Sequence, residues 1–349
     1  MATGQFALSP EQESTVTQFF YRQLFITPPP LNSHEVKIFG KTAIITGSNS
    51  GIGFECASQL LDLGVGKLIL AVRRVESGEE AKVKIASQRG ESATKIEVWK
   101  LDMSEYDSIM DFTKRANTLA RLDIVILNAG VRKGTEVFNA STGYEESIQV
   151  NFLSSFLLLA RLLPIMKAKR QNSEPGRITL VSSDSARMAL LEERNESPIL
   201  PAFKRSHTAF NTGEQYNKSK VLMQLMMSQL AKYVPSSVAN INMATPGFCR
   251  GTNITRELYS PMVAFVADNV TRFFGRSAAV GARVVVNAAV KQGSESHGQC
   301  IGDCKLKPMA RLIYTEEGEA LSQALWEELM SEFSFAGLRE IMLDLKRLD

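Results

Sequence analysis

The sequence has little cysteine and histidine, with four cysteines and three histidines among 349 residues. So few cysteines do not make a disulfide framework, and no signal peptide precedes them, which indicates reduced thiols in a cytoplasmic protein. His297, Cys300 and Cys304 are close in sequence, but a fourth ligand and the C-x2-C spacing of zinc sites are missing. The sequence therefore predicts no metal site.

The chain also lacks a strong charge imbalance and a long apolar run. Its formal net charge is +3 and no basic cluster occurs, which disfavours nucleic-acid binding. No apolar window is expected to reach the roughly 18 residues of a membrane span. The closest, Phe156–Met166, contains Arg161 and Pro164, so we expect a buried core helix. A P-loop is absent as well, which argues against a nucleotide-dependent hydrolase or transferase.

Hydrophobic residues make up 44% of the chain, enough for a large core, and they form short β-rich runs that alternate with helical stretches. The expected strands are Thr42–Thr46, Lys67–Val72, Lys95–Lys100, Ile124–Leu127, Arg177–Val181, Val238–Ala244 and a closing strand, Gln299–Gly302. The expected helices lie near residues 52–63, 77–88, 105–120, 142–168, 214–233 and 315–333. This alternation predicts an α/β fold class, a Rossmann-type doubly wound parallel sheet with ligands at the carboxyl ends of its strands.

We expect one domain, residues 37–349, preceded by an N-terminal extension, residues 1–36. In the extension, Ser9 and Pro10 form a typical helix start. The helix is predicted to continue to about Phe25, before a run of prolines ends it.

Two long segments, residues 184–215 and 252–280, interrupt the pattern, and long excursions in enzymes are usually lids or binding loops. The first separates Ser183 from Tyr216 by 32 residues. The second has an apolar helical face between Leu258 and Phe274, for which core packing is the alternative. Apolar residues of the two segments are expected to wall the substrate site: Met188, Leu190, Leu191, Ile199, Leu200, Phe203, Phe265 and Phe273.

Two motifs carry the chemistry. Thr46-Gly-Ser-Asn-Ser-Gly-Ile-Gly53 joins an apolar strand to a helix, where glycines let the backbone approach a pyrophosphate and the helix N-terminus supplies amide donors. Tyr216-Asn-Lys-Ser-Lys220 places a phenol and an ammonium group four residues apart, on one face of a helix. A free Tyr is a slow proton donor near neutrality, so the Lys charge is expected to lower its pKa.

In this order the two motifs resemble those of the short-chain dehydrogenase/reductase family, over about residues 38 to 305. The overall pattern looks most like retinol-dehydrogenase-like members and reductases of fungal secondary metabolism. The resemblance implies an oxidoreductase that transfers a hydride between a nicotinamide and a ketone or secondary alcohol.

By the same resemblance, Tyr216 and Lys220 are catalytic and Lys220 also holds the nicotinamide ribose. Ser183 binds the substrate oxygen, with Ser182 as its rival, and Asn151 fixes a water that relays protons to Lys220. The cofactor-binding residues implied are Gly47, Ser48, Asn49, Ser50, Gly51, Ile52, Gly53, Asp102, Asn128, Ala129, Gly130, Tyr216, Lys220, Pro246, Gly247 and Thr252. Thr252 is displaced by one position from the Ser or Thr that most members carry.

The choice of cofactor depends on the end of the second strand. Twenty residues after Gly53, where NAD-binding chains carry an acid for the ribose, this chain has Arg73 and Arg74. Guanidinium groups suit a 2′-phosphate. The sequence therefore predicts NADP(H), with Arg73 as the better candidate.

The expected partner is a small carbonyl or alcohol substrate that is bulky, apolar and uncharged. A homodimer through the helices near 142–168 and 214–233, as in family dimers, is also expected unless the N-terminal extension blocks that face. The alternative function is a non-redox protein of the same fold: an isomerase, a cyclase or an NADP-binding regulatory protein.

Overall fold

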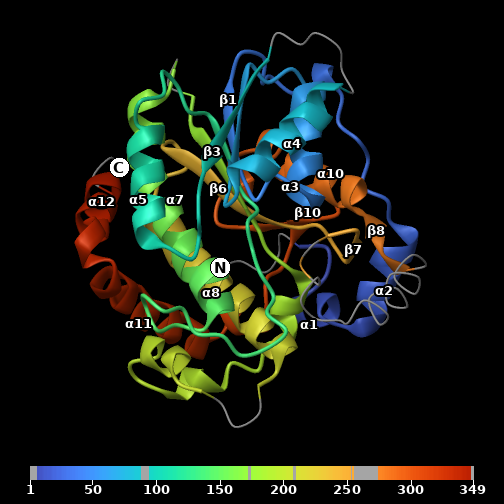
Figure 1. Cartoon of the computed structure of the whole chain (residues 1–349). Helices are drawn as coiled ribbons and strands as arrows, with labels where there is room; N and C mark the ends of the chain where they lie inside the picture. The colour runs from blue at the N-terminus through green and yellow to red at the C-terminus, as the bar shows by residue number, and fades with distance from the viewer. Residues whose placement is uncertain are drawn as a thin grey trace.

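The computed structural model describes residues 6–87, 94–171, 174–206, 210–252, 254 and 274–346. A central sheet is covered by helices on both faces (Figure 1). In the described residues this sheet has eight strands, in the order β10-β9-β6-β5-β4-β1-β2-β3. The sequence prediction of a doubly wound Rossmann-type α/β fold is therefore confirmed.

Seven strands of the sheet are parallel, and only β10 at the edge is antiparallel to its neighbour. Their bounds are β1 Thr42–Thr46, β2 Lys67–Val72, β3 Lys95–Lys100, β4 Ile124–Leu127, β5 Gly176–Val181, β6 Ala239–Thr245, β9 Cys300–Gly302 and β10 Lys305–Lys307. Each predicted strand is present within one residue of its expected bounds. β10 was not predicted, because two of its three residues are lysines.

Side chains of successive strand residues enter two separate hydrophobic clusters, one on each face of the sheet. Ala43 and Ile45 of β1 pack with α3 (Gly51–Asp62), α4 (Val75–Ser87) and α10 (Ala278–Val290), and Ile44 packs on the other face. That face is covered by α5 (Tyr106–Ala116), α7 (Ser155–Lys169) and α8 (Thr212–Tyr233). The sequence did not predict α10, because its valines have low helix propensity. The helix is stabilised by burial against α3 and the sheet.

The helix before β5 matches the predicted helix near residues 142–168. α6 (Glu146–Ile148), the π-helical turn η3 (Gln149–Ser154) and α7 form one continuous helix. By length and composition, Glu146–Lys169 is the one helix of the described residues that could cross a membrane, with a mean hydropathy of 1.6. The prediction that no apolar window reaches about 18 residues is therefore wrong. However, 89% of the 18-residue apolar window of this helix is buried inside the protein, as expected of a core helix.

The N-terminal extension contains two helices in place of the predicted one, α1 (Pro10–Glu13) and α2 (Val16–Phe25), followed by the short turn η2 (Ser33–Glu35). The helix breaks because Ser14 and Thr15 satisfy backbone groups with their side chains: Ser14 Oγ donates to the Pro10 carbonyl at 2.6 Å, and Thr15 Oγ1 accepts from the Gln18 amide at 3.2 Å. The extension lies beside the two-stranded parallel sheet of β7 (Cys249–Arg250) and β8 (Arg276–Ser277) (Figure 1).

The C-terminal helices α11 (Glu316–Glu332) and α12 (Leu338–Lys346) pack against α8 and α7. α11 matches the predicted helix, with Thr315 as its N-cap. The helices α7 and α8, for which the resemblance implies a dimer contact, are thus covered by the C-terminal helices, and a homodimer stays a prediction. Short 3-10 turns complete the chain: η4 Asp184–Met188, η5 Glu192–Asn195, η6 Leu200–Lys204, η8 Ser294–Ser296, η9 Arg311–Tyr314 and η10 Ser334–Ala336.

Candidate active site

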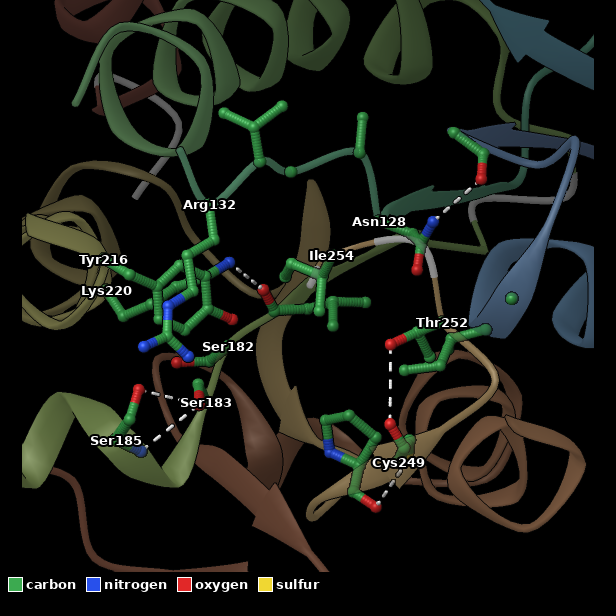
Figure 2. Close-up of a pocket in the computed structure, with 18 of the residues that line it drawn as sticks. Asn128, Arg132, Ser182, Ser183, Ser185, Tyr216, Lys220, Cys249, Thr252 and Ile254 are labelled. Carbon is green, nitrogen blue, oxygen red and sulfur yellow. Dashed lines mark hydrogen bonds between the residues drawn. The ribbon is translucent and has the colours of Figure 1, made fainter. Parts of the chain in front are cut away.

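A cavity of about 850 Å³ opens at the carboxyl ends of the parallel strands, where doubly wound sheets bind their ligands. Its walls come from the β1–α3 turn, the segments after β2 to β6, the first turns of α8 and the N-terminal extension. Figure 2 shows Ser183, Tyr216, Lys220 and Arg132 converging on one part of the cavity and Thr252 on another.

Each glycine of the β1–α3 turn is required, either by its backbone conformation or by the lack of space for a side chain. Gly47 and Gly51 have positive φ angles of 63° and 55°, which other residues rarely adopt. A Cβ on Gly53 would lie 2.4 Å from the Gly47 carbonyl oxygen and 2.5 Å from Asn128 Nδ2. α3 begins at Gly51, so the amide groups of its first turn face the cavity, as a diphosphate site requires.

Asn128 holds this turn in place. Its Nδ2 donates to the carbonyls of Thr46 at 3.0 Å and Gly47 at 3.1 Å, while Thr46 Oγ1 accepts from the amides of Asn128 and Ala129 (Figure 2). Ser48 is fully buried and its hydroxyl donates to the Ile45 carbonyl at 3.0 Å. Ser48 and Gly53 therefore shape the turn without lining the cavity, whereas Asn49, Ser50, Ile52, Ala129 and Gly130 line it.

The far end of the cavity has the groups expected around an adenosine. Arg73 and Arg74 follow β2, are exposed to solvent and line the cavity. Ser77 lies with them, and its Oγ accepts from Asn49 Nδ2 at 3.2 Å. Asp102 follows β3 and also lines the cavity, with one carboxylate oxygen accepting from the Ser104 amide at 3.0 Å.

Ser183 and Tyr216 face each other across the other end. Burial raises the pKa of Tyr216 to about 12, against the lowering effects of a hydrogen bond from Ser183 and of the Arg132 charge. Ser182 also lines the cavity, but its hydroxyl accepts from Gln224 Nε2 at 3.4 Å, whereas Ser183 is hydrogen-bonded to Tyr216. This contact favours Ser183 of the two serines left open by the sequence.

The expectation that Lys220 lowers the pKa of Tyr216 is wrong for this structure. Lys220 Nζ donates to the Val181 carbonyl at 2.9 Å and lies 5.5 Å from the centroid of the Tyr216 ring. Burial lowers the pKa of Lys220 itself to about 8. Desolvation is the largest cause of the pKa shift of Tyr216 and the cause of the pKa shift of Lys220.

Asn151 does not line the cavity but braces two of its walls. Its Oδ1 accepts from the Val131 amide, and its Nδ2 donates to the Val131 carbonyl, both at 2.8 Å. Nδ2 also donates to Ser219 Oγ of α8 at 3.0 Å. A Cβ on Gly130 would lie 3.1 Å from Asn151 Oδ1 and 3.8 Å from Lys220 Nζ, so the bare glycine keeps room between them. The water relay assigned to Asn151 stays a prediction.

The extension holds the loop after β6. Gln23 Nε2 donates to the Phe248 carbonyl at 2.8 Å, and Gln23 Oε1 accepts from the Phe248 amide at 3.1 Å. Arg276 is buried and donates to the carbonyls of Arg22 at 2.9 Å and Ile26 at 3.0 Å. Pro246 and Gly247, predicted to pass the nicotinamide, line the cavity within this loop.

A buried ion network lies beneath the same wall. Arg22 of α2 pairs with Glu13 at 3.1 Å, Asp184 at 3.3 Å and Asp303 at 3.6 Å. Asp303 also pairs with Arg276 at 2.7 Å. Asp184 pairs with Arg187 as well, and Glu13 pairs with Lys307. The network joins the extension to the segment after Ser183 and to the β9–β10 turn, a connection that no local sequence signal could reveal.

The apolar excursion before Tyr216 is mostly core. Of its predicted wall residues, only Met188 lines the cavity, and Leu190 is exposed. Four others are buried in the hydrophobic core, because the η5 and η6 turns pack onto α8 and α11: Leu191, Ile199, Leu200 and Phe203. The cavity instead gains Val16, Phe19, Phe248 and Ile254, which the sequence did not indicate.

The second excursion is described only at its ends. Phe265 and Phe273 lie outside the described residues, so their lid role stays a prediction. Thr252 lines the cavity and its hydroxyl donates to the Cys249 carbonyl at 3.4 Å. Its Cα lies 3.5 Å from the position of a Cβ on Gly51. Thr252 thus packs on the glycine turn.

His297 accepts from the Ile241 amide through Nδ1 at 3.2 Å, a contact within the core. Among the described residues, no group of three or more His, Cys, Asp or Glu side chains is placed to hold a metal ion.

A doubly wound sheet with a glycine turn after its first strand is the architecture of dinucleotide-binding enzymes. A profile of the short chain dehydrogenases matches residues 41–194. The short-chain dehydrogenase fogG of Aspergillus ruber is 50% identical over 340 residues, which cover 97% of each chain. The short chain dehydrogenase/reductase mfmJ of Annulohypoxylon moriforme is 42% identical, over 95% of this chain and 97% of its own.

A solved structure from Mycobacterium paratuberculosis shares the fold, with a TM-score of 0.61 at 22% identity, and covers 87% of this chain and 97% of its own. The protein therefore belongs to the short-chain dehydrogenase/reductase family, whose members are oxidoreductases that bind a nicotinamide cofactor.

Proposed function

We propose that this protein uses NADP(H) to reduce the carbonyl group of a bulky, mainly apolar ketone, or to oxidise the matching secondary alcohol. The observation that carries this proposal is the convergence of Ser183, Tyr216 and Lys220 on a cavity that also contains the glycine turn. Because similar proteins come from filamentous fungi, we favour an intermediate of fungal secondary metabolism as substrate.

The residues present fit a dinucleotide phosphate. The bare Cα of Gly53 lets the turn close tightly on Gly47 and Asn128, and the start of α3 provides amide donors for a diphosphate. Arg73 and Arg74 provide guanidinium groups for a 2′-phosphate at the end of β2. When bound, the nicotinamide would supply a hydride to the carbonyl carbon.

The proton comes from Tyr216. A pKa of about 12 keeps its phenol protonated at neutral pH, so the group can donate as negative charge develops on the carbonyl oxygen. Ser183, beside the phenol, can donate a second hydrogen bond to the same oxygen. Oxidation of an alcohol needs the phenolate, which is scarce at neutral pH, and this favours the reductive direction.

Lys220 supports this proton donor. With a pKa of about 8 it is charged at neutral pH, and its hydrogen bond to Val181 fixes the ammonium group beside the Tyr216 ring. Two further donor positions of the ammonium group remain for a ribose hydroxyl and for a water in the relay of Asn151.

The apolar side chains around this end of the cavity favour a bulky substrate and exclude water from the reacting carbonyl. They are contributed by three parts of the chain: Val16 and Phe19 of the extension, Met188 after Ser183, and Phe248 and Ile254 after β6.

The test is a screen of aryl and alicyclic ketones with the purified protein, followed by the absorbance of NADPH and of NADH. We expect NADPH to be consumed in preference to NADH, and Tyr216→Phe to lower kcat by at least about two orders of magnitude. The non-redox alternative predicts a different result. The protein would bind NADP+ in calorimetry, but no ketone would oxidise NADPH or NADH and no alcohol would reduce NADP+.

A further inference from the structure

Arg132 is a charged side chain in the catalytic end of the cavity with no part in the chemistry so far. It follows the Asn128–Val131 loop after β4 and lines the cavity (Figure 2). Its Cζ lies 6.0 Å from the centroid of the Tyr216 ring. A Cβ on Gly213 would lie 3.3 Å from Nη2, so the guanidinium group fills the space beside the first turn of α8.

The other arginines at this end of the cavity have acidic partners. Arg22 pairs with Glu13 at 3.1 Å, and Arg187 pairs with Asp184. Within the described part of the chain Arg132 has no carboxylate partner, and its Nε is buried without a hydrogen bond. Glu214, the acid in the first turn of α8, instead accepts from the amides of Leu190 at 2.8 Å and Leu191 at 3.2 Å.

A guanidinium group that is partly removed from water and has no anionic partner in the protein is unfavourable. The Tyr216 phenol does not supply the anion, because burial raises its pKa to about 12 and leaves it neutral. Arg73, at the end of β2, already serves the cofactor phosphate in the proposed function. The cofactor diphosphate is assigned to the start of α3 in the same proposed function, which leaves the substrate as the source of an anion at Arg132.

We propose that Arg132 binds an acidic group of the substrate, so that the substrate is a mainly apolar carbonyl compound with a carboxylate, or a similarly acidic oxygen, close to its carbonyl. The inference rests on the proposed carbonyl reduction. Arginine presents paired donors in the plane of a carboxylate, and the anion must reach Arg132 while the carbonyl oxygen reaches Tyr216. The two groups of the substrate are therefore a few bonds apart, which differs from the uncharged substrate expected from the sequence.

The test compares a keto acid, 4-oxo-4-phenylbutanoate, with its primary amide, which has the same shape and no charge. Binding to the full chain with saturating NADP+ is measured by calorimetry. We expect the acid to bind about ten- to a hundredfold more tightly than the amide, the range of a charge-assisted hydrogen bond. Arg132→Met should remove this preference, and Arg132→Lys should restore part of it.

Lys133→Met is the matched control, since it removes a neighbouring positive charge, and it should keep the preference for the acid. Equal affinities for acid and amide, or no measurable binding of the acid, would overturn the proposal. So would an Arg132→Met variant that weakens both probes equally, because the arginine would then act on Tyr216 or on the fold. Oxidation of NADPH by the two probes is scored separately: if neither is reduced, carbonyl reduction fails while the binding comparison still decides the role of Arg132.

Discussion

The two ends of the cavity are built in different ways. The cofactor end consists of strand ends and one glycine turn, whose residues are fixed by adjacent strands of the sheet, as Asn128 after β4 is by Thr46 and Gly47 at the end of β1. The substrate end is assembled from segments far apart in the chain: Gln23 is paired with Phe248, 225 residues away. The first end is fixed by the fold itself, whereas the second depends on additions to the fold.

This contrast assigns different tasks to the two ends. A diphosphate needs the same amide donors in every member of a family, and the doubly wound sheet supplies them. A substrate pocket has to differ between members, and a docked N-terminal segment changes the pocket without disturbing the sheet. The buried network around Arg22 is then the device that holds the added wall in position.

The largest effect is expected from breaking this network at Glu13. Glu13 is 1% exposed and pairs with Arg22 and Lys307. Glu13→Gln removes the charge at nearly constant shape and leaves the buried Arg22 and the half-buried Lys307 with fewer partners, which we expect to cost about 3–5 kcal/mol of unfolding free energy. Urea unfolding measures the loss.

The control lies two residues away on the same helix. Glu11 pairs with Arg311 at 3.3 Å, but both side chains are exposed, so Glu11→Gln should leave stability unchanged within error. Similar losses for the two variants would contradict a special role of the buried network. If Glu13→Gln left the unfolding free energy unchanged, the extension would not be anchored through its charges.

The cofactor end of the cavity is easier to predict from the sequence than the substrate end, because its residues belong to local patterns. Strands such as Ile124–Leu127, the glycine turn and Tyr216–Lys220 are local patterns, and their approximate arrangement follows from the topology of a parallel sheet. The partners of Glu13 and Gln23 are not local, so no periodicity indicates them.

The apolar residues before Tyr216 show a further limit. Leu191, Ile199 and Leu200 are as apolar as a lid requires, but they are buried against the core. Composition alone cannot distinguish a wall of the cavity from the inside of the fold. Arg132 shows the opposite case, because a single arginine in a loop is usually a solvated charge, and only its position beside Tyr216 makes it notable.

At the catalytic end, the two adjacent serines allow a direct comparison. Ser183→Ala should lower kcat by about two to three orders of magnitude, because it removes a donor to the developing oxyanion. Ser182→Ala should have a much smaller effect, since its hydroxyl interacts with Gln224. Both rates are measured with the best ketone of the screen, and equal losses would mean that the two hydroxyl groups share the role.

At the cofactor end, Arg73→Asp should weaken NADPH far more than NADH, because an attraction for the 2′-phosphate becomes a repulsion. We expect the ratio of the two dissociation constants to change by about ten- to a hundredfold. Fluorescence titration of each dinucleotide measures it, and Arg74→Asp shows whether the second arginine contributes. Equal affinity of the unmodified protein for NADPH and NADH would refute the assignment.

The smallest expected effect is a pH dependence that links the two ends through Lys220. Its pKa is lowered to about 8 by burial, so the ammonium group is charged below this pH and neutral above it. In the proposed function the charged form binds the ribose and feeds the proton relay. Reductive kcat/KM for NADPH, which reports the free enzyme, should therefore be constant below about pH 8. Above it, the value should decline by about tenfold per pH unit.

Tyr216, with a pKa of about 12, stays protonated in this range and cannot cause the decline. Lys220→Arg keeps its charge at these pH values and should give a lower but flat profile. A decline that persists in Lys220→Arg would assign the titration to another group.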